Sequence, residues 1–140
     1  EAFRLGALTL RVLWPRHPVP KGDDPNDWAT VIHARYGQLD ALLTADAESN
    51  VTLPLRPPQA EILKVAHHGS ADEGLDDLLR AVRPRIALIS VGAGNDYGHP
   101  APSTLAVLDE ALPGAVHRTD LEGAITVESD GRRIEVRSER

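Results

Sequence analysis

The sequence predicts an α/β fold in which a mixed β-sheet packs against helices. Three observations support this class. Short apolar runs with strand-like alternation recur along the chain, two segments in the second half have helical hydrophobic spacing, and turn residues join neighbouring runs into hairpins near both ends. Strands that alternate with helices favour parallel pairing. Because hairpins require antiparallel pairing, the pattern argues against a simple doubly wound sheet.

The first half of the chain is predicted to consist mainly of strands. An alternating run from the first residue is ended by Trp14-Pro15, and a loop rich in proline and charge follows over 15–27. A turn at Gly37-Gln38 joins two further apolar runs into a hairpin. Residues 50–60 are predicted to be irregular because they are rich in proline. The predicted strands of this half are 1–12, 29–36, 39–46 and 61–66.

Two helices and a second hairpin are predicted in the second half. The segment 71–82 has leucines at helical spacing and acidic residues near its start, which suit the helix dipole. A second helix is predicted over 103–112, with Ser103 as its N-cap. Strands are predicted at 85–92 and 115–119, and Asp130-Gly131 predicts a type I′ hairpin between 123–129 and 132–138.

Composition narrows the classes of function. The 140 residues suffice for one domain, over 1–140, and no run is long and apolar enough to span a membrane. The absence of cysteine excludes disulfides and cysteine-ligated zinc. A formal net charge of −6 argues against tight non-specific DNA binding, but not against a phosphodiesterase whose metal ions carry the positive charge. No signal-peptide pattern and no methionine occur, so we expect the chain to be part of a longer protein.

Polar clusters follow three of the predicted strands. The clusters are Asp46, His67 with His68, and Asn95 with Tyr97 and His99 in a glycine-rich loop. In an ordered sheet they would meet on one edge, where open α/β sheets place their sites. Asp and His side chains together suit zinc, manganese or iron(II). No Gly-x-Ser-x-Gly elbow occurs to support a serine hydrolase instead.

The first two clusters also have a purely structural interpretation. Asp46 and Glu48 are residue types that are common in turns. Side chains alternate across a strand, so His67 and His68 would point to opposite faces if the strand continued, one on the surface and one in the core. Ser70 would then cap the following helix. The histidines expected to be structural or solvated are His17, His33 and His117.

Four segments in this order resemble one known family. They are LLTADAE, LKVAHHGS, RPRIALISVGAGNDYGHP and HRTDLEGAITV. From residue 26 to the end, the chain resembles the metallo-β-lactamase-like domain of ComEC, the channel protein for DNA uptake in bacterial competence. HHGS and NDYGHP are specific only in combination at this spacing. The resemblance implies an αββα sandwich, of which the chain is the C-terminal portion, with two divalent ions, Mn²⁺ or Zn²⁺, at one edge of the complete domain.

The resemblance also implies roles for individual residues. Asp46 would bridge the two metal ions, and His68 would ligate the second one. His67 and His99 would be catalytic groups near the substrate phosphate. The residues that would line the substrate cleft are Ser70, Asn95 and Tyr97. The implied chemistry is hydrolysis of phosphodiesters in DNA, by which the strand that is not imported is degraded.

Departures from the family pattern keep other functions open. The HxHxDH motif, which supplies most of the family's metal ligands, is absent, and no His-x-His occurs in the chain. Ala45 stands where the family has glycine, and Ala29 where it has serine. Asp46 and His68 alone are too few for tetrahedral zinc. The alternatives are a degenerate domain that guides DNA or scaffolds the channel, and a related hydrolase of another phosphodiester, such as a phosphorylcholine ester.

The resemblance implies partners and a location as well. The partners are DNA and the membrane-channel portion of the same protein, and the domain would lie outside the cytoplasmic membrane. If half of the sandwich is missing, an apolar face is expected to stay exposed, and self-association would cover it.

Overall fold

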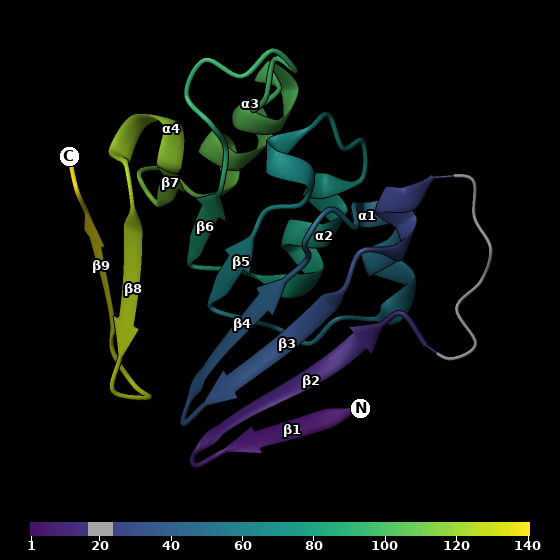
Figure 1. The fold of residues 1–140 in the computed structure, drawn as a ribbon, viewed down its shortest axis with the longest axis vertical. Coiled ribbons are helices and arrows are strands. Elements are labelled where there is room, and N and C mark those ends of the chain that lie inside the picture. The colour runs from purple at the N-terminus through teal and green to yellow at the C-terminus, as the bar shows by residue number, and fades with distance from the viewer. Residues whose placement is uncertain (17–23) are drawn as a thin grey trace.

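A seven-stranded mixed sheet, helices and a separate β-hairpin make up the computed structural model, which describes residues 1–16 and 24–140 (Figure 1). The predicted α/β class with a mixed sheet is confirmed. The expectation that His17 is solvated falls outside the described residues. No helix in the described residues combines the length and the apolar character needed to cross a bilayer.

Strands that are adjacent in the main sheet are also consecutive in the sequence. They are β1 (Ala2–Leu5), β2 (Leu8–Trp14), β3 (Val31–Tyr36), β4 (Leu39–Leu43), β5 (Ile62–Lys64), β6 (Ile86–Ile89) and β7 (Val116–Arg118). β1 to β4 pair antiparallel, and β4 to β7 pair parallel. β4, β5 and β6 therefore end at the same edge of the sheet. β2 also ends there, because two antiparallel steps separate it from β4.

The predicted helices are α2 (Leu75–Val82) and α3 (Pro102–Ala111). The apolar side of α2 is buried, and Asp76 and Asp77 lie in its first turn, as the dipole argument predicts. The shorter helices are α1 (Ser49–Thr52), α4 (Thr119–Glu122) and the 3₁₀ helices η1 (Pro25–Trp28), η2 (Leu53–Leu55) and η3 (His67–Gly69).

A row of side chains on three parallel strands forms the centre of the core. Leu42 on β4 is the register partner of Leu63 on β5, which in turn pairs with Ala87 on β6. All three are 0% exposed and belong to one cluster with the buried leucines of α2. Because burying a leucine side chain stabilises by about 1.5–3 kcal/mol, the row ties the parallel strands to the helix layer.

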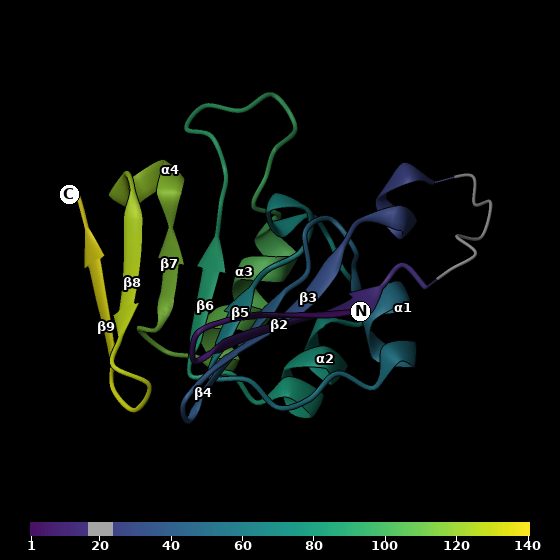
Figure 2. The same cartoon turned by 60° about the horizontal axis from the view of Figure 1, so that its bottom comes forward.

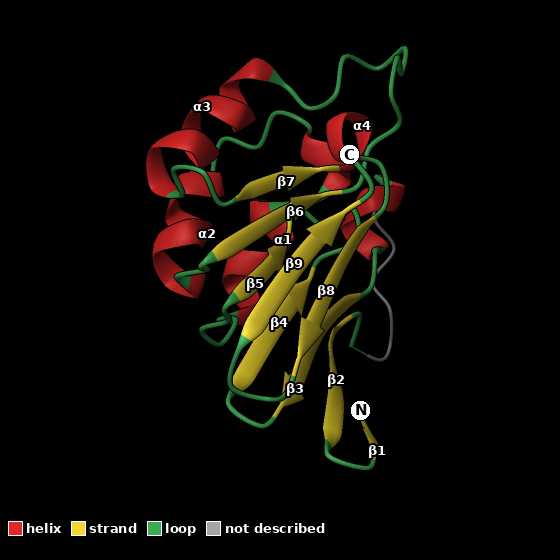
Figure 3. Cartoon of the chain, turned by 90° about the vertical axis from the view of Figure 1, so that its left-hand side faces the viewer, coloured by secondary structure: helices red, strands yellow, loops and turns green. Residues whose placement is uncertain are grey.

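The last two strands, β8 (Ile125–Ser129) and β9 (Ile134–Ser138), form an antiparallel hairpin that is separate from the main sheet. Figures 2 and 3 show it beside β7, on the side of the sheet away from α2 and α3. The amide of Gln38, in the β3–β4 turn, donates to the carbonyl of Gly131 over 2.7 Å. A Cβ on Gly37 would lie 2.7 Å from the same oxygen, so this contact requires glycine.

The predicted type I′ turn at Asp130-Gly131 is wrong. The hairpin is present, but its loop comprises the four residues 130–133. The carboxylate of Asp130 accepts hydrogen bonds from the amides of Arg132 and Arg133, at 2.9 and 2.8 Å. These bonds favour a longer turn over a two-residue one.

Other differences concern element boundaries. The single strand predicted over 1–12 is the β1–β2 hairpin, which turns at Gly6-Ala7. The segment predicted to be irregular, 50–60, contains most of α1 and all of η2. Ser103 does not cap α3, because the helix begins at Pro102, whose fixed φ and missing N–H suit the first helical position.

Large apolar side chains are exposed on the N-terminal strands. They are Phe3, Leu5, Tyr36 and Leu43, with exposed fractions of 52%, 68%, 38% and 37%. An exposed apolar surface was expected, and self-association through it stays a prediction.

His33 and His117 form ion pairs outside the polar edge. His33 Nε2 lies 2.6 Å from Oδ1 of Asp40, and His117 Nδ1 lies 2.9 Å from Oε2 of Glu122. Partial burial opposes the charge of Glu122 and raises its pKa. The hydrogen bonds from His117 and from the Arg118 amide, with the charge of His117, outweigh that effect and hold the pKa of Glu122 below its ordinary 4.5.

We predict that Glu122→Gln reduces stability at neutral pH but not in acid. A carboxyl whose folded pKa is depressed contributes stability above its unfolded pKa, and this contribution is lost as the pH falls through the folded value. The free energy of unfolding of the variant and the wild type, measured by urea titration from pH 7 down to about pH 3, should converge below the ordinary value of 4.5. A pH-independent difference would contradict the prediction.

Replacing Leu63 by alanine should destabilise the protein by about 2–5 kcal/mol, because it opens a cavity in the central row. Leu5, which is 68% exposed, provides the control. Leu5→Ala should change the free energy of unfolding by only about 0.5 kcal/mol. Equal losses in the two variants would show that the central row is not the core of the fold.

Candidate functional site

Three loops meet at the edge where β4, β5 and β6 end. They are the turn after β4, η3 after β5, and the loop over 90–101 after β6. The amide of His67 donates to the carbonyl of Ala45 over 3.1 Å, and the amide of Ala101 donates to that of Gly69 over 2.8 Å. The three polar clusters predicted from the sequence are thus brought to one edge.

His68 and Asp46 face each other at this edge. Nε2 of His68 lies 3.8 Å from Oδ1 of Asp46, which is too far for a direct hydrogen bond. Nδ1 of His68 donates to the carbonyl oxygen of Ser90 over 2.7 Å. Because a carbonyl can only accept, the neutral ring carries its proton on Nδ1 and presents the Nε2 lone pair toward Asp46.

This pair has the chemistry of a partial metal site. Metal-ligating histidines usually donate their other ring N–H to a carbonyl or carboxylate, as His68 does to Ser90. An imidazole nitrogen and a carboxylate both ligate zinc and manganese. The pair supplies half of a tetrahedral set, and in the part of the chain that the structure describes no third His, Cys, Asp or Glu completes it. The side chains are 50% and 38% exposed, so further ligands can reach them.

The two histidines lie in a strained turn. His67 and His68 were expected to point to opposite faces if the strand continued through them. It does not continue, because β5 ends at Lys64. Both have left-handed backbone, with φ of 46° and 54°. Such residues cost on the order of 1–3 kcal/mol each and persist where the surroundings hold them. The ring centroids are 6.4 Å apart, and both rings lie at the polar edge.

Glu48 connects the first two loops, and the sequence did not identify this role. Its Oε1 accepts from Nδ1 of His67 over 3.0 Å and from the hydroxyl of Ser70. The carboxylate therefore fixes the His67 tautomer with Nε2 as the acceptor. Ser70 is 8% exposed and does not cap α2, whose N-cap position is Gly74. The only sequence signal was a second carboxylate two residues after Asp46, which suits an ordinary turn equally well.

Asn95 organises the third loop. Its amide donates to the carbonyls of Gly92 and His99, at 3.1 and 2.7 Å, and its Oδ1 accepts from the amides of Tyr97 and His99. Its polar atoms are thus used within the loop. Tyr97 is 84% exposed and stacks on His99, whose ring is edge-on to that of His67 at a centroid distance of 5.5 Å. An aromatic row leads from solvent to the polar edge.

Lys64 and Ala45 support the turn that carries Asp46. Nζ of Lys64 donates to the carbonyl of Ala45 over 2.6 Å. Burial lowers the pKa of the Lys64 ammonium, and the charge of Asp46 acts in the opposite direction. Ala45 has φ of 47°, a left-handed conformation that glycine adopts without a steric penalty.

We predict that Ala45→Gly raises the free energy of unfolding by about 1 kcal/mol. Removing the Cβ relieves about 1–2 kcal/mol of left-handed strain, which exceeds the entropy that glycine adds to the unfolded chain. Ala41→Gly, in the extended strand β4, is the control and should lose about 1 kcal/mol. Thermal or urea unfolding measures both, and a loss at both positions would contradict the strain argument.

Comparisons with known proteins identify two curated relatives. No protein-family model matches the chain, and no solved structure matches it significantly. It is 30% identical over 129 residues to ComE operon protein 3 of Bacillus subtilis, a match that covers 89% of this chain and 16% of that protein. It is 33% identical over 135 residues to Recombination protein 2 of Haemophilus influenzae, covering 95% of this chain and 17% of that protein.

The chain therefore spans about a sixth of the length of these relatives. The match extends over nearly all of the chain, and it agrees with the resemblance drawn from the HHGS and NDYGHP segments. The chain is homologous to one segment of the proteins of the ComEC family.

Proposed function

We propose that the chain supplies part of a metal-dependent phosphodiesterase centre in a bacterial DNA-uptake protein, where it degrades the strand that is not imported. The observation that carries the proposal is the pair formed by Asp46 and His68. Nε2 of His68 lies 3.8 Å from Oδ1 of Asp46, and the bond from Nδ1 to Ser90 leaves Nε2 of the neutral ring with its lone pair toward that carboxylate. A bound cation would satisfy both donors at once.

The remaining chemistry depends on how the chain holds its own side chains. Asp46 and His68 would hold a divalent ion, which would supply an activated water nucleophile and positive charge for the phosphate. Ser90 keeps His68 in the ligating tautomer. Glu48 keeps the proton of His67 on Nδ1. Nε2 of His67 can therefore accept a proton or a hydrogen bond near the substrate phosphate. His99 lies against His67 as a second catalytic group.

The predicted substrate-binding residues differ in how they can contribute. Tyr97 is exposed and is free to contact the substrate directly. Ser70 acts through Glu48, because its hydroxyl donates to that carboxylate. Asn95 shapes the loop that presents Tyr97 and His99. In this proposal Tyr97 makes the direct contact, and the other two residues fix the geometry around it.

The proposed setting of the reaction is supported by the relatives. The proposed partners are DNA and the membrane-channel portion of the same protein, at the extracytoplasmic face of the bacterial membrane. Support comes from the homology to the ComEC family and from the resemblance of the three loops. The competing proposal, a domain that guides DNA without catalysis, is favoured by the lack of a third ligand near the pair in the described residues.

Calorimetric titration with Mn²⁺ and Zn²⁺ tests the metal pair directly. We expect binding to the wild-type chain that is lost in His68→Ala and in Asp46→Ala, because each variant removes one of the two donors. His117→Gln is the matched control, since it removes an imidazole that pairs with Glu122 away from the site. Binding that survives both site variants would overturn the metal assignment.

Hydrolysis distinguishes the two proposed functions. In the protein that carries this chain, Asp46→Ala should lower metal-dependent DNA hydrolysis by about 100-fold or more. Bis-p-nitrophenyl phosphate and phosphorylcholine esters serve as alternative substrates. DNA hydrolysis at the wild-type rate in Asp46→Ala would refute the catalytic proposal, and a preference for phosphorylcholine esters would move it to the related hydrolase.

A further inference from the structure

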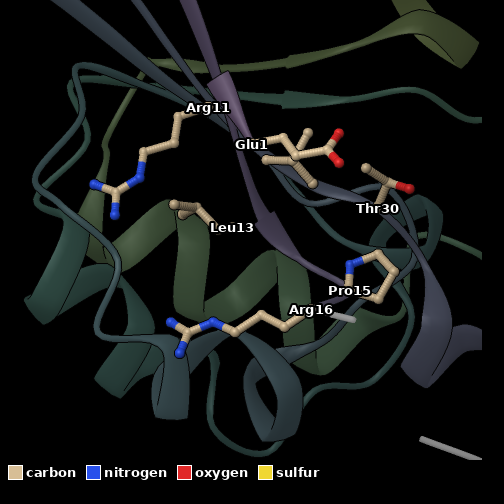
Figure 4. A pocket seen from close by; sticks show the side chains of 7 residues that line it. Glu1, Arg11, Leu13, Pro15, Arg16 and Thr30 are labelled. Carbon is tan, nitrogen blue, oxygen red and sulfur yellow. The ribbon is translucent and has the colours of Figure 1, made fainter. Parts of the chain in front are cut away.

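The C-terminal end of β2 carries an arginine-lined cavity. It has a volume of about 660 Å³, and Arg11 and Arg16 are the cations in its lining. In Figure 4 both guanidinium groups lie on one side of the cavity, and the carboxylate of Glu1 lies on the other. Both arginine side chains are exposed. Arg80, Arg118 and Arg137, which lie on other elements, form ion pairs with nearby carboxylates.

A second, aromatic cavity also uses the end of β2. Trp14 and Trp28, the two tryptophans of the chain, both line a cavity of about 300 Å³ together with Asn50. Trp14 Nε1 donates to the carbonyl of Asp27 over 2.6 Å, and the Asn50 amide donates to the carboxylate of Asp27 over 2.9 Å. These two bonds fix η1 against β2 and α1, so the walls of the cavity are held in place before any ligand binds.

Both cavities lie close to the polar edge. Leu13 and Pro15 line the arginine cavity and Trp14 lines the aromatic one, so both cavities use residues from the end of β2. β2 ends at the same edge of the sheet as β4, β5 and β6. Asn50 is four residues from Asp46, a span of at most about 14 Å even for fully extended chain. Both places are therefore within reach of a single bound oligonucleotide.

We propose that the end of β2 is a binding site for single-stranded DNA that flanks the scissile phosphate. Arg11 and Arg16 bind backbone phosphates, and the cavity between Trp14 and Trp28 receives a base. Proteins that bind single strands combine a cationic path for the backbone with aromatic faces for the bases, and both kinds of side chain line cavities at the end of β2. The inference rests on the proposed function, because it assumes that DNA is the substrate.

Tryptophan fluorescence tests the site without any mutation. Because both tryptophans of the chain line the aromatic cavity, their quenching reports on that cavity alone. Oligothymidylate should quench the emission. An oligomer of abasic sites with the same number of phosphates should quench it far less and should bind on the order of ten-fold more weakly, since it offers no base to stack. Anisotropy of an end-labelled oligonucleotide measures binding anywhere on the protein in parallel.

Variants separate the two parts of the site. Arg11→Gln with Arg16→Gln should weaken binding and reduce the slope of log affinity against log salt by about 1.4, because each phosphate bound on a single strand contributes about 0.7. Trp28→Leu should weaken binding on the order of ten-fold, with folding checked by its melting curve. The control is Arg80→Gln with Arg137→Gln, which removes two exposed arginines on α2 and β9.

The outcomes distinguish this inference from the proposed function. Binding seen by anisotropy without tryptophan quenching, or with an unchanged salt slope in the Arg11 and Arg16 variant, would overturn the site and leave DNA as the substrate. Loss of binding in the control variant alone would also overturn it. The effect of Asp46→Ala on hydrolysis decides the proposed function independently, because Asp46 lines neither cavity.

Discussion

Leu42, Leu63 and Ala87 lie side by side on three parallel strands, and the rest of the structure depends on their burial against the helix layer. Side chains alternate along a strand, so a shift of one residue in any of these strands would expose its buried residue to solvent. Burial therefore fixes the register. With the register fixed, β4, β5 and β6 end at one edge of the sheet, and the loops that follow them start at that edge.

The polar edge is assembled by backbone strain that neighbouring hydrogen bonds compensate. Ala45, His67 and His68 all have left-handed backbone. The carbonyl of Ala45 receives bonds from the Lys64 ammonium and from the His67 amide, and both imidazole rings are held through Nδ1. Strained residues that are each fixed by a specific partner are typical of a preorganised site.

Sequence patterns predicted what depends on periodicity and missed what depends on tertiary contacts. The parallel strands, α2 and the convergence of three polar loops follow from apolar spacing and strand order. The path of η3 does not follow from them, because it depends on tertiary contacts. The Lys64 ammonium and the His67 amide both donate to the carbonyl of Ala45, in the turn after β4. Glu48 was equally hidden: a carboxylate in a turn looks ordinary until His67 and Ser70, about twenty residues away, are seen to donate to it.

Net charge does not describe how the charges are distributed over the molecule. The chain carries a formal charge of −6, which argues against binding a polyanion. Its charges are not evenly spread: Asp76 and Asp77 lie on α2, whereas Arg11 and Arg16 line a cavity at the end of β2. Fields from exposed charges are screened within about 8–10 Å at physiological salt, so the local field at this cavity is set by Arg11, Arg16 and Glu1 in its lining rather than by the carboxylates of α2. An acidic chain can therefore carry a cavity lined by two arginines at the end of β2, at the same edge of the sheet as Asp46 and His68.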